Sequence, residues 1–429
     1  MRVALWLMAL FAVAAASALF AGSNPGSVTL FWAPYRVDLS LNLALLLLCA
    51  GFLLLHIALR ALTAMLNIPA QARRWRLQQR ERAIQAGLLD ALAHLVGGRF
   101  IRSRKAAEHV LSLEESVAQG GEQLGYGARL RALAHLLAAE SAHALQDRSL
   151  RDAHFDLALR NSSSRDAQDM RDGVHMRAAR WAFDDRDAAR SMQWLDRLPQ
   201  GAARRTVALR LRFKAARLAG QPLRALETAR LLTKHRAFSE VAGVSIARGL
   251  AMEHLRSAHD PAQLVRAWTE LEPAERAMPD VALQGAERLL ALGGEATLAR
   301  QWLLPVWDAM VRVPSALNTV QALHLIRVLE QGFGSKTSLP DAHWLARIES
   351  AQLANPRDAG LQYLAGIVCM RLALWGKAQQ LLKQALATLQ DSGLRRDAWR
   401  ALAELAEQRN DPVGATDALR SALREALRT

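Results

Sequence analysis

Two long apolar runs begin the chain. Val3–Ala21 carries no charged residue, and Leu39–Leu59 is almost as apolar. A helix of about 20 residues rises about 30 Å, which matches the hydrocarbon thickness of a bilayer. The pattern therefore predicts two N-terminal transmembrane helices, at about 3–21 and 39–62.

A different pattern separates the two runs. In "GSVTLFWAPYRVDLSL" (Gly26–Leu41), apolar and other side chains alternate on both sides of Ala33-Pro34. Alternation with a central proline favours a short two-stranded, hairpin-like loop. Trp32 and Tyr35 are residue types that favour a membrane interface. An irregular loop remains the alternative.

The first run has a second interpretation. Arg2 and the small residues Ala16-Ser17-Ala18 resemble the start and cleavage site of a signal peptide. The run is longer than the apolar part of a usual signal peptide, so we favour an uncleaved helix. Arginines follow the second run and are scarce in the loop, so the positive-inside rule predicts that the body and both termini are cytoplasmic.

A basic segment, residues 67–83, follows the anchor of residues 1–66. Pro69 is expected to stop or kink the helix there. Basic groups beside a membrane are attracted to anionic headgroups, by about 1 kcal/mol each. We therefore expect contact with membrane lipids, and a solvated helix face is the alternative. The expected contact residues are Arg73, Arg74, Trp75, Arg76 and Arg80.

The remainder, residues 84–429, has apolar residues at helical spacing, with Gly, Pro and Asn breaks roughly 20–40 residues apart. This pattern predicts an all-α chain whose body is a tetratricopeptide-like α-solenoid of antiparallel helix pairs. Such a solenoid presents a concave surface that typically binds proteins. An ordinary multi-helix globule is the alternative.

The clearest repeat lies near the C-terminus. "LAGIVCMRLALWGKAQQLLKQAL" is followed about 37 residues later by "WRALAELAEQRNDPVGATDALRSAL", close to the tetratricopeptide period. Small residues recur where the two helices of such a hairpin touch, and "LVGGRFIRSRKAAEHVL", "DRSLRDAHFDLAL" and "AARLAGQPLRALETARLL" resemble weaker copies. The predicted packing residues are Gly366, Trp375, Ala378 and Ala385 in one copy, and Trp399, Ala403, Ala415 and Ala422 in the next.

Composition and short motifs identify no catalytic or metal-binding site. The formal net charge is +15, which fits either an anionic partner or an Arg-rich coding bias, and we expect no nucleic acid. Cys49 and Cys369 define no disulfide framework, and the histidines form no metal motif. Gly334–Thr337 lacks the glycines of a phosphate-binding loop. No acid, base and nucleophile assemble, so we expect a binding protein, not an enzyme, with no metal and no cofactor that the sequence reveals.

The whole chain resembles the HemY proteins of proteobacteria, most specifically at its N-terminus. The resemblance rests on "NPGSVTLFWAPYRVDLSLNLALLLL" and "IPAQARRWRLQQRERAIQAGLLDALAHLVGGRFIRSRKAAE", with Tyr35–Leu41 and Gly98-Arg99-Phe100 as its signatures. It implies a multi-pass protein of the bacterial inner membrane, a periplasmic loop, a cytoplasmic tetratricopeptide domain and a role late in protoheme formation.

The resulting expectation is a membrane-tethered scaffold that organises late heme-pathway enzymes, or porphyrin transfer, at the membrane. Two alternatives stay open. One is a tethered adaptor for envelope assembly or proteolysis. The other is direct binding of heme or porphyrin, for which no histidine stands out.

Overall fold

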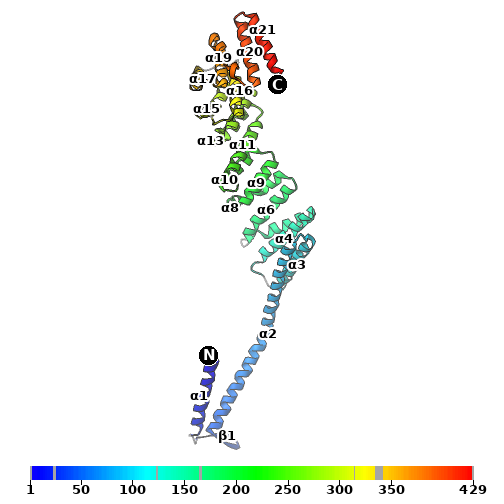
Figure 1. Ribbon diagram of the computed structural model, residues 1–429. Coiled ribbons are helices and arrows are strands. Elements are labelled where there is room, and N and C mark those ends of the chain that lie inside the picture. The colour runs from blue at the N-terminus through cyan, green and yellow to red at the C-terminus, as the bar shows by residue number, and fades with distance from the viewer. Residues whose placement is uncertain are drawn as a thin grey trace. The chain divides into compact units, whose positions relative to one another are not determined.

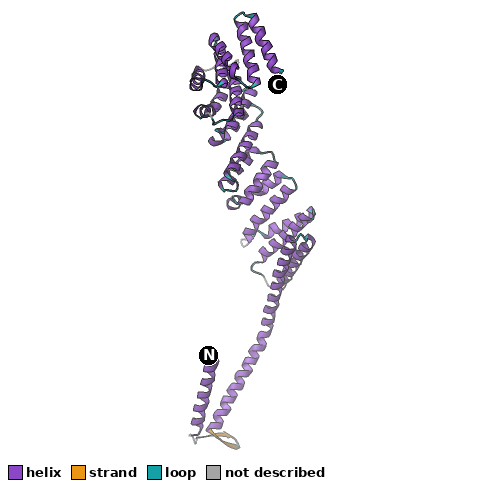
Figure 2. Cartoon of the chain, in the orientation of Figure 1, coloured by secondary structure: helices purple, strands orange, loops and turns teal. Residues whose placement is uncertain are grey.

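The computed structural model describes residues 2–22, 26–121, 124–163, 167–313, 315–333 and 342–427. The described chain is helical apart from one pair of strands (Figures 1 and 2). It divides into two compact units, Met1–Ala167 and Gln168–Thr429. Gly334–Thr337, the stretch compared above with a phosphate-binding loop, lies outside the described residues.

The first unit contains the apolar runs and the first helix pairs. Its elements are α1 (Arg2–Gly22), β1 (Ser27–Trp32), β2 (Tyr35–Ser40), α2 (Leu41–Val96), α3 (Phe100–Gln119), α4 (Gly127–Ala144) and α5 (Arg148–Asn161). Its core lies where the end of α2 packs against α3 and α4, and Ile84, Ala91, Ala107 and Val110 are fully buried there.

The segment between the apolar runs is an antiparallel hairpin. Trp32 pairs with Tyr35 next to the turn, and Ser27 pairs with Ser40 at the open end. The amide of Leu41 donates a hydrogen bond to the Gly26 carbonyl at 2.9 Å. Ser40 then caps α2 with its side-chain oxygen, so the hairpin leads directly into the long helix.

The helix α2 has 56 residues and continues through Pro69. Of the two expected effects of Pro69, a stop or a kink, the stop is therefore wrong, and the anchor and the basic segment belong to one element. A proline in a helix removes one backbone donor and costs about 3 kcal/mol. A helix with several turns on both sides, and with its far end packed in the core, can carry that cost.

The second unit consists of helix pairs and short connecting helices. Its elements are α6 (Gln168–Asp184), α7 (Ala188–Asp196), α8 (Gln200–Ala203), α9 (Thr206–Leu218), α10 (Pro222–Lys234), α11 (Glu240–Arg256), α12 (Pro261–Glu270), α13 (Pro273–Arg276), α14 (Pro279–Ala291), α15 (Ala296–Arg312), α16 (Thr319–Phe333), α17 (Ala342–Ala354), α18 (Ala359–Arg371), α19 (Trp375–Thr388), α20 (Ser392–Gln408) and α21 (Pro412–Ala426). A continuous apolar core runs from α9 to α21.

One turn recurs between the two helices of a pair. The amide of Gln146 donates to the His143 carbonyl, and the amide of Asp147 donates to the Ala142 carbonyl, each at 2.9 Å. This is the Schellman arrangement, in which a left-handed residue ends one helix and the next residue begins another. The left-handed residues of the equivalent turns are Gly98, Gln146, Arg186, Gly220, Ala373 and Asn410.

The recurring turn sets a recurring contact between the paired helices. Ser103 donates through its Oγ to the Ala91 carbonyl at 2.7 Å, and Ser191 does so to the Ala179 carbonyl at 2.8 Å. Both serines are fully buried. The turns at Gln146, Arg186 and Gly220 lie about 34 to 40 residues apart, near the tetratricopeptide period. The repeat is thus carried by turn geometry and small contact residues.

Candidate functional site

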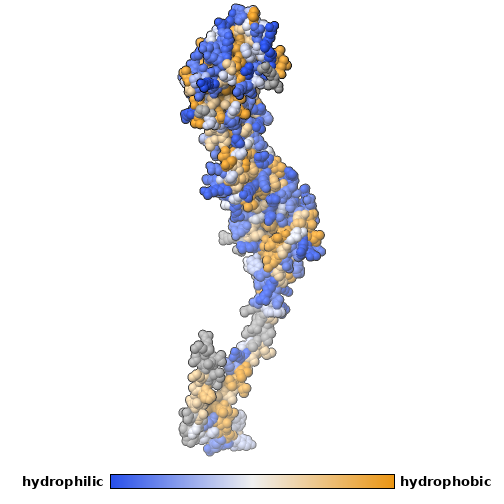
Figure 3. Space-filling view, viewed as in Figure 1, coloured by the Kyte–Doolittle hydropathy of each residue, from blue (hydrophilic) through white to orange (hydrophobic). Residues whose placement is uncertain are grey.

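Three features of the described residues bear on function: an apolar helix segment, a basic segment that follows it, and the surfaces of the helix pairs. The apolar segment is Leu41–Thr63 of α2, with a mean hydropathy of 2.3 and no part of it buried. It is the one helical stretch, among the residues searched, that is long and apolar enough to cross a membrane. Figure 3 shows its apolar surface over the first half of α2. The expected first span, 3–21, is helical in α1 but does not appear as a second candidate.

The basic segment lies further along α2. Arg73, Trp75 and Arg76 are exposed, and the side chain of Arg74 lies outside the described residues. Arg73 follows Thr63 by about 15 Å along a straight helix. Arg80 donates to the Ser116 carbonyl of α3 at 3.4 Å, so it is engaged by the helical body. Arg73, Trp75 and Arg76 are therefore the exposed residues of this set that lie nearest to the apolar segment along α2.

The predicted packing residues differ in burial, and one of them, Gly366, has a close contact across its helix pair. A Cβ added to Gly366 in α18 would lie 2.8 Å from Cγ of Leu382 in α19. Trp399 is half-buried against the core, whereas Trp375, the first residue of α19, is 37% exposed. The small residues Ala378, Ala385, Ala403, Ala415 and Ala422 are all buried.

A histidine pair joins α4 to α5 in the first unit. Nδ1 of His135 lies 3.1 Å from Nδ1 of His154, so one ring nitrogen donates and the other accepts. Burial, then the neighbouring His154 and Arg131, lower the pKa of His135 to about 4. Glu108 of α3 lies 3.7 Å from Nε2 of His154. The pair is therefore held neutral as a packing contact, and no group of three metal-binding side chains is found among the residues searched.

A buried acid lies in the second unit. Tyr363 of α18 donates through its hydroxyl to Oε1 of Glu330 in α16 at 2.5 Å. Burial raises the pKa of Glu330. Burial, followed by the Glu330 charge, raises the pKa of Tyr363. Tyr363 is fully buried, so this contact joins two helices and leaves the phenol no access to a substrate.

Polar contacts link the first helices of neighbouring pairs. Arg248 of α11 pairs with Asp280 of α14 at 3.0 Å, and Gln321 of α16 donates to the same carboxylate at 2.7 Å. His324 of α16 lies 3.1 Å from Glu287 of α14. Opposite charges on this stretch are largely matched, so it offers little net charge to a ligand.

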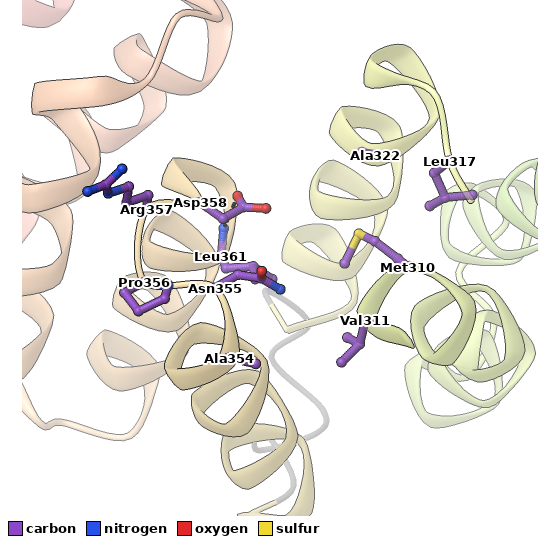
Figure 4. Close-up of a pocket in the computed structure, with 10 residues that line it drawn as sticks. All are labelled: Met310, Val311, Leu317, Ala322, Ala354, Asn355, Pro356, Arg357, Asp358 and Leu361. Atoms are coloured by element: carbon purple, nitrogen blue, oxygen red, sulfur yellow. Dashed lines mark hydrogen bonds between the residues drawn. The ribbon is translucent and has the colours of Figure 1, made fainter. Parts of the chain in front are cut away.

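A hollow of about 440 Å³ lies between α15–α16 and α17–α18. Figure 4 shows Met310 on one side and Asn355 and Leu361 on the other. The carboxylate of Asp358 lines it but accepts from the amides of Gly360 and Leu361 at the start of α18. The Asp358 carboxylate therefore caps the N-terminus of α18.

A second hollow, the α6–α9 groove, has a basic character. It measures about 400 Å³ and lies between the first helices of two successive pairs. The sequence analysis missed this groove, although cations at positions i, i+3 or i+4 in each helix were a usable signal. Its lining residues are Met176, Arg177 and Arg180 of α6, and Val207, Arg210, Leu211 and Lys214 of α9.

Residues 26–146 match the family model described as the HemY protein N-terminus. This stretch of the chain is similar to the N-terminal part of the HemY proteins. The matched HemY region contains the strand pair, all of α2, and α3 and α4, and it ends at the left-handed residue Gln146. The basic segment of α2 lies inside the HemY region, and the α6–α9 groove lies beyond it.

Comparisons with individual proteins add little to the HemY assignment. No curated protein matches the chain. One similar solved structure is the Naa15/Naa10 complex bound to HypK-THB, at 11% identity, covering 76% of this chain and 57% of that chain with a TM-score of 0.23. Another is the P58(IPK) TPR domain, at 12% identity, covering 80% of this chain and 98% of that chain with a TM-score of 0.21. The helical-hairpin fold rests on the recurring turn and the paired helices themselves.

Proposed function

We propose that the protein is a membrane-tethered, non-enzymatic scaffold that acts in a late step of protoheme biosynthesis. One observation carries the proposal: α2 is a single helix that runs from an apolar, exposed segment at Leu41–Thr63 into the buried core at Ile84. A helical-repeat body is thereby joined to a membrane-spanning segment without a linker. Repeat surfaces of this kind typically bind proteins.

A role in heme biosynthesis would explain why the helical body is held at a membrane. Porphyrins are hydrophobic and partition into bilayers, so enzymes that pass them on gain from being held at the membrane. The scaffold would collect such enzymes on the surfaces of its helix pairs. No ligand chemistry at a catalytic site is needed for this role.

The proposed topology has two spans and cytoplasmic termini. α1 (Arg2–Gly22) has no charged residue after Arg2 and would form the first span. The strand pair would lie in the periplasm, and the arginines after Leu41–Thr63 would lie inside, in accord with the positive-inside rule. Reporter fusions that are active only in the cytoplasm, placed at each end, test this arrangement, and an inactive C-terminal fusion would contradict it.

The function is tested by deleting the gene and measuring porphyrins. We expect late porphyrin intermediates to accumulate, and the full chain to reverse this. A chain whose Leu41–Thr63 segment is replaced by a soluble helix should not reverse it. Normal porphyrin levels with envelope defects would favour an adaptor for envelope assembly or proteolysis. A Soret band on the purified full chain at micromolar heme would favour direct heme binding.

A further inference from the structure

The α6–α9 groove concentrates positive charge over an apolar floor. Arg177 and Arg180 come from α6, and Arg210 and Lys214 come from α9. All four are exposed. Between them lies Leu211, which is 6% exposed.

The positive charge of the groove is only partly compensated. Arg180 pairs with Asp184, one turn along the same helix, at 3.1 Å. Among the described residues, Arg210 and Lys214 have no carboxylate within ion-pair distance. The charges on the row formed by α11, α14 and α16 are matched in pairs. A net positive charge thus distinguishes the groove from that neighbouring stretch.

The spacing of the cations suits carboxylates on a peptide. Side chains one helical turn apart lie about 5–6 Å from each other, and alternate side chains of an extended peptide lie about 7 Å apart. Guanidinium groups bind carboxylates through two parallel hydrogen bonds. The apolar floor adds a place for one side chain: Val207 is 69% exposed, and Met176 is partly exposed beside it.

Other anionic ligands fit less well. Single-stranded nucleic acids are typically held by stacking on aromatic side chains, and the lining of the groove contains none. A lipid chain needs a long apolar channel, whereas the floor here consists of Met176, Val207 and Leu211 alone among the lining residues. The volume, about 400 Å³, accommodates a few side chains.

We propose that the α6–α9 groove binds an acidic peptide segment with an apolar side chain, supplied by a partner protein. This inference deepens the proposed scaffold function and rests on it, because the groove would be the place where a partner enzyme docks. Its Asp or Glu carboxylates pair with Arg210 and Lys214, and its apolar side chain packs on Leu211.

The test measures binding of a fluorescein-labelled peptide of Asp and Glu residues around a central Leu-Leu. The full chain is used in a non-ionic detergent, and binding is followed by fluorescence anisotropy. We expect saturable binding that weakens as salt is raised, because exposed charges are screened. The Arg210→Glu/Lys214→Glu variant should bind at least about tenfold more weakly, since two attractions become repulsions. A peptide with Lys in place of each acid should not bind.

A matched control carries the same change of charge elsewhere. Arg190 in α7 and Arg224 in α10 are exposed residues on the second helices of the same two pairs. The Arg190→Glu/Arg224→Glu variant should bind as the unchanged protein does. If both variants bind the peptide equally weakly, the loss of binding is due to net charge and not to the groove, and the proposal is overturned. Hydrogen exchange of α9 in each variant checks that the pair remains folded.

Two further outcomes separate this inference from its alternatives. Displacement of the peptide by vesicles of anionic lipid, but not by neutral ones, would assign the groove to a headgroup and overturn the proposal. Porphyrin levels in cells that carry only Arg210→Glu/Lys214→Glu distinguish the two proposals. If this variant loses peptide binding yet restores normal porphyrin levels, the groove is not the scaffold's docking site, while the scaffold function stands.

Discussion

The close approach of α18 and α19 at Gly366 allows a sharp stability prediction. In Gly366→Ala the new Cβ would lie 2.8 Å from Cγ of Leu382 and 3.3 Å from its backbone nitrogen. Ala is better than Gly in a helix by about 1 kcal/mol, whereas overpacking a well-packed contact costs about 1–3 kcal/mol. The closest atoms, Cγ and Cδ2 of Leu382, belong to a fully buried side chain that has little room to move, so overpacking should win. We expect a net loss of up to about 2 kcal/mol.

Gly376 provides the control, because it lies in α19 of the same pair and a Cβ there would have no neighbour within 4 Å. Gly376→Ala should be neutral or stabilising by up to about 1 kcal/mol. Hydrogen exchange of α18 and α19, followed by mass spectrometry on the full chain, measures the local opening of the pair. The amides should exchange at least about fivefold faster in Gly366→Ala than in Gly376→Ala, because the two variants differ by the overpacking cost of about 1–3 kcal/mol and 1.4 kcal/mol is a factor of ten. Equal or slower exchange in Gly366→Ala would refute the close contact.

Four other changes have definite expected results. Ser191→Ala should lower the stability of the α6–α7 pair by about 1 kcal/mol, because its buried hydrogen bond to a backbone carbonyl is lost. The amides of α6 and α7 should then exchange faster; an unchanged exchange rate would contradict the hydrogen bond. Ala373→Gly should stabilise the α18–α19 turn by up to about 1 kcal/mol in the same assay, because a left-handed residue is strained unless it is Gly; a loss of protection would contradict the turn geometry. The pKa of His135 is lowered to about 4, so the unfolded chain takes up a proton first, and protection of α4 and α5 should fall as the pH drops from about 6.5 toward 4. His135→Leu should weaken this dependence without removing it, because burial also lowers the pKa of His154; an unchanged dependence would contradict the assignment to His135. Arg73→Glu/Arg76→Glu should weaken the contact of α2 with anionic vesicles. With vesicles present, α2 should be cleaved faster in this variant than in the unchanged protein; equal cleavage rates would place these arginines in solvent.

Local pattern was enough to predict the repeat fold of the last helix pairs. Gly366 lies against Leu382 where α18 meets α19, and Ala378 is fully buried in the same pair. The equivalent positions in the earlier copies were harder to recognise because they hold other residues. Ser103 and Ser191 replace a methyl with a hydroxyl that bonds the facing carbonyl, and a search for small apolar residues passes over them.

Two features were not predicted from the sequence, each for a physical reason. Pro69 has a local preference to end a helix, but the packing of the far part of α2 outweighs it. The α6–α9 groove depends on residues that are about 30 positions apart in the chain, Arg180 and Arg210 for example, and only the folded helix pairs bring them together. Charge counted along the chain shows an excess of arginine without its location.

The unbroken course of α2 has a mechanical consequence. A flexible linker would let the membrane segment and the first helix pair rotate independently of each other, whereas a continuous helix resists both bending and twisting. In the proposed arrangement, a turn of the segment Leu41–Thr63 about its axis, caused by a neighbouring membrane protein or a change in bilayer thickness, would turn α3 with it. The tether would then set the orientation of the first binding surface as well as its location.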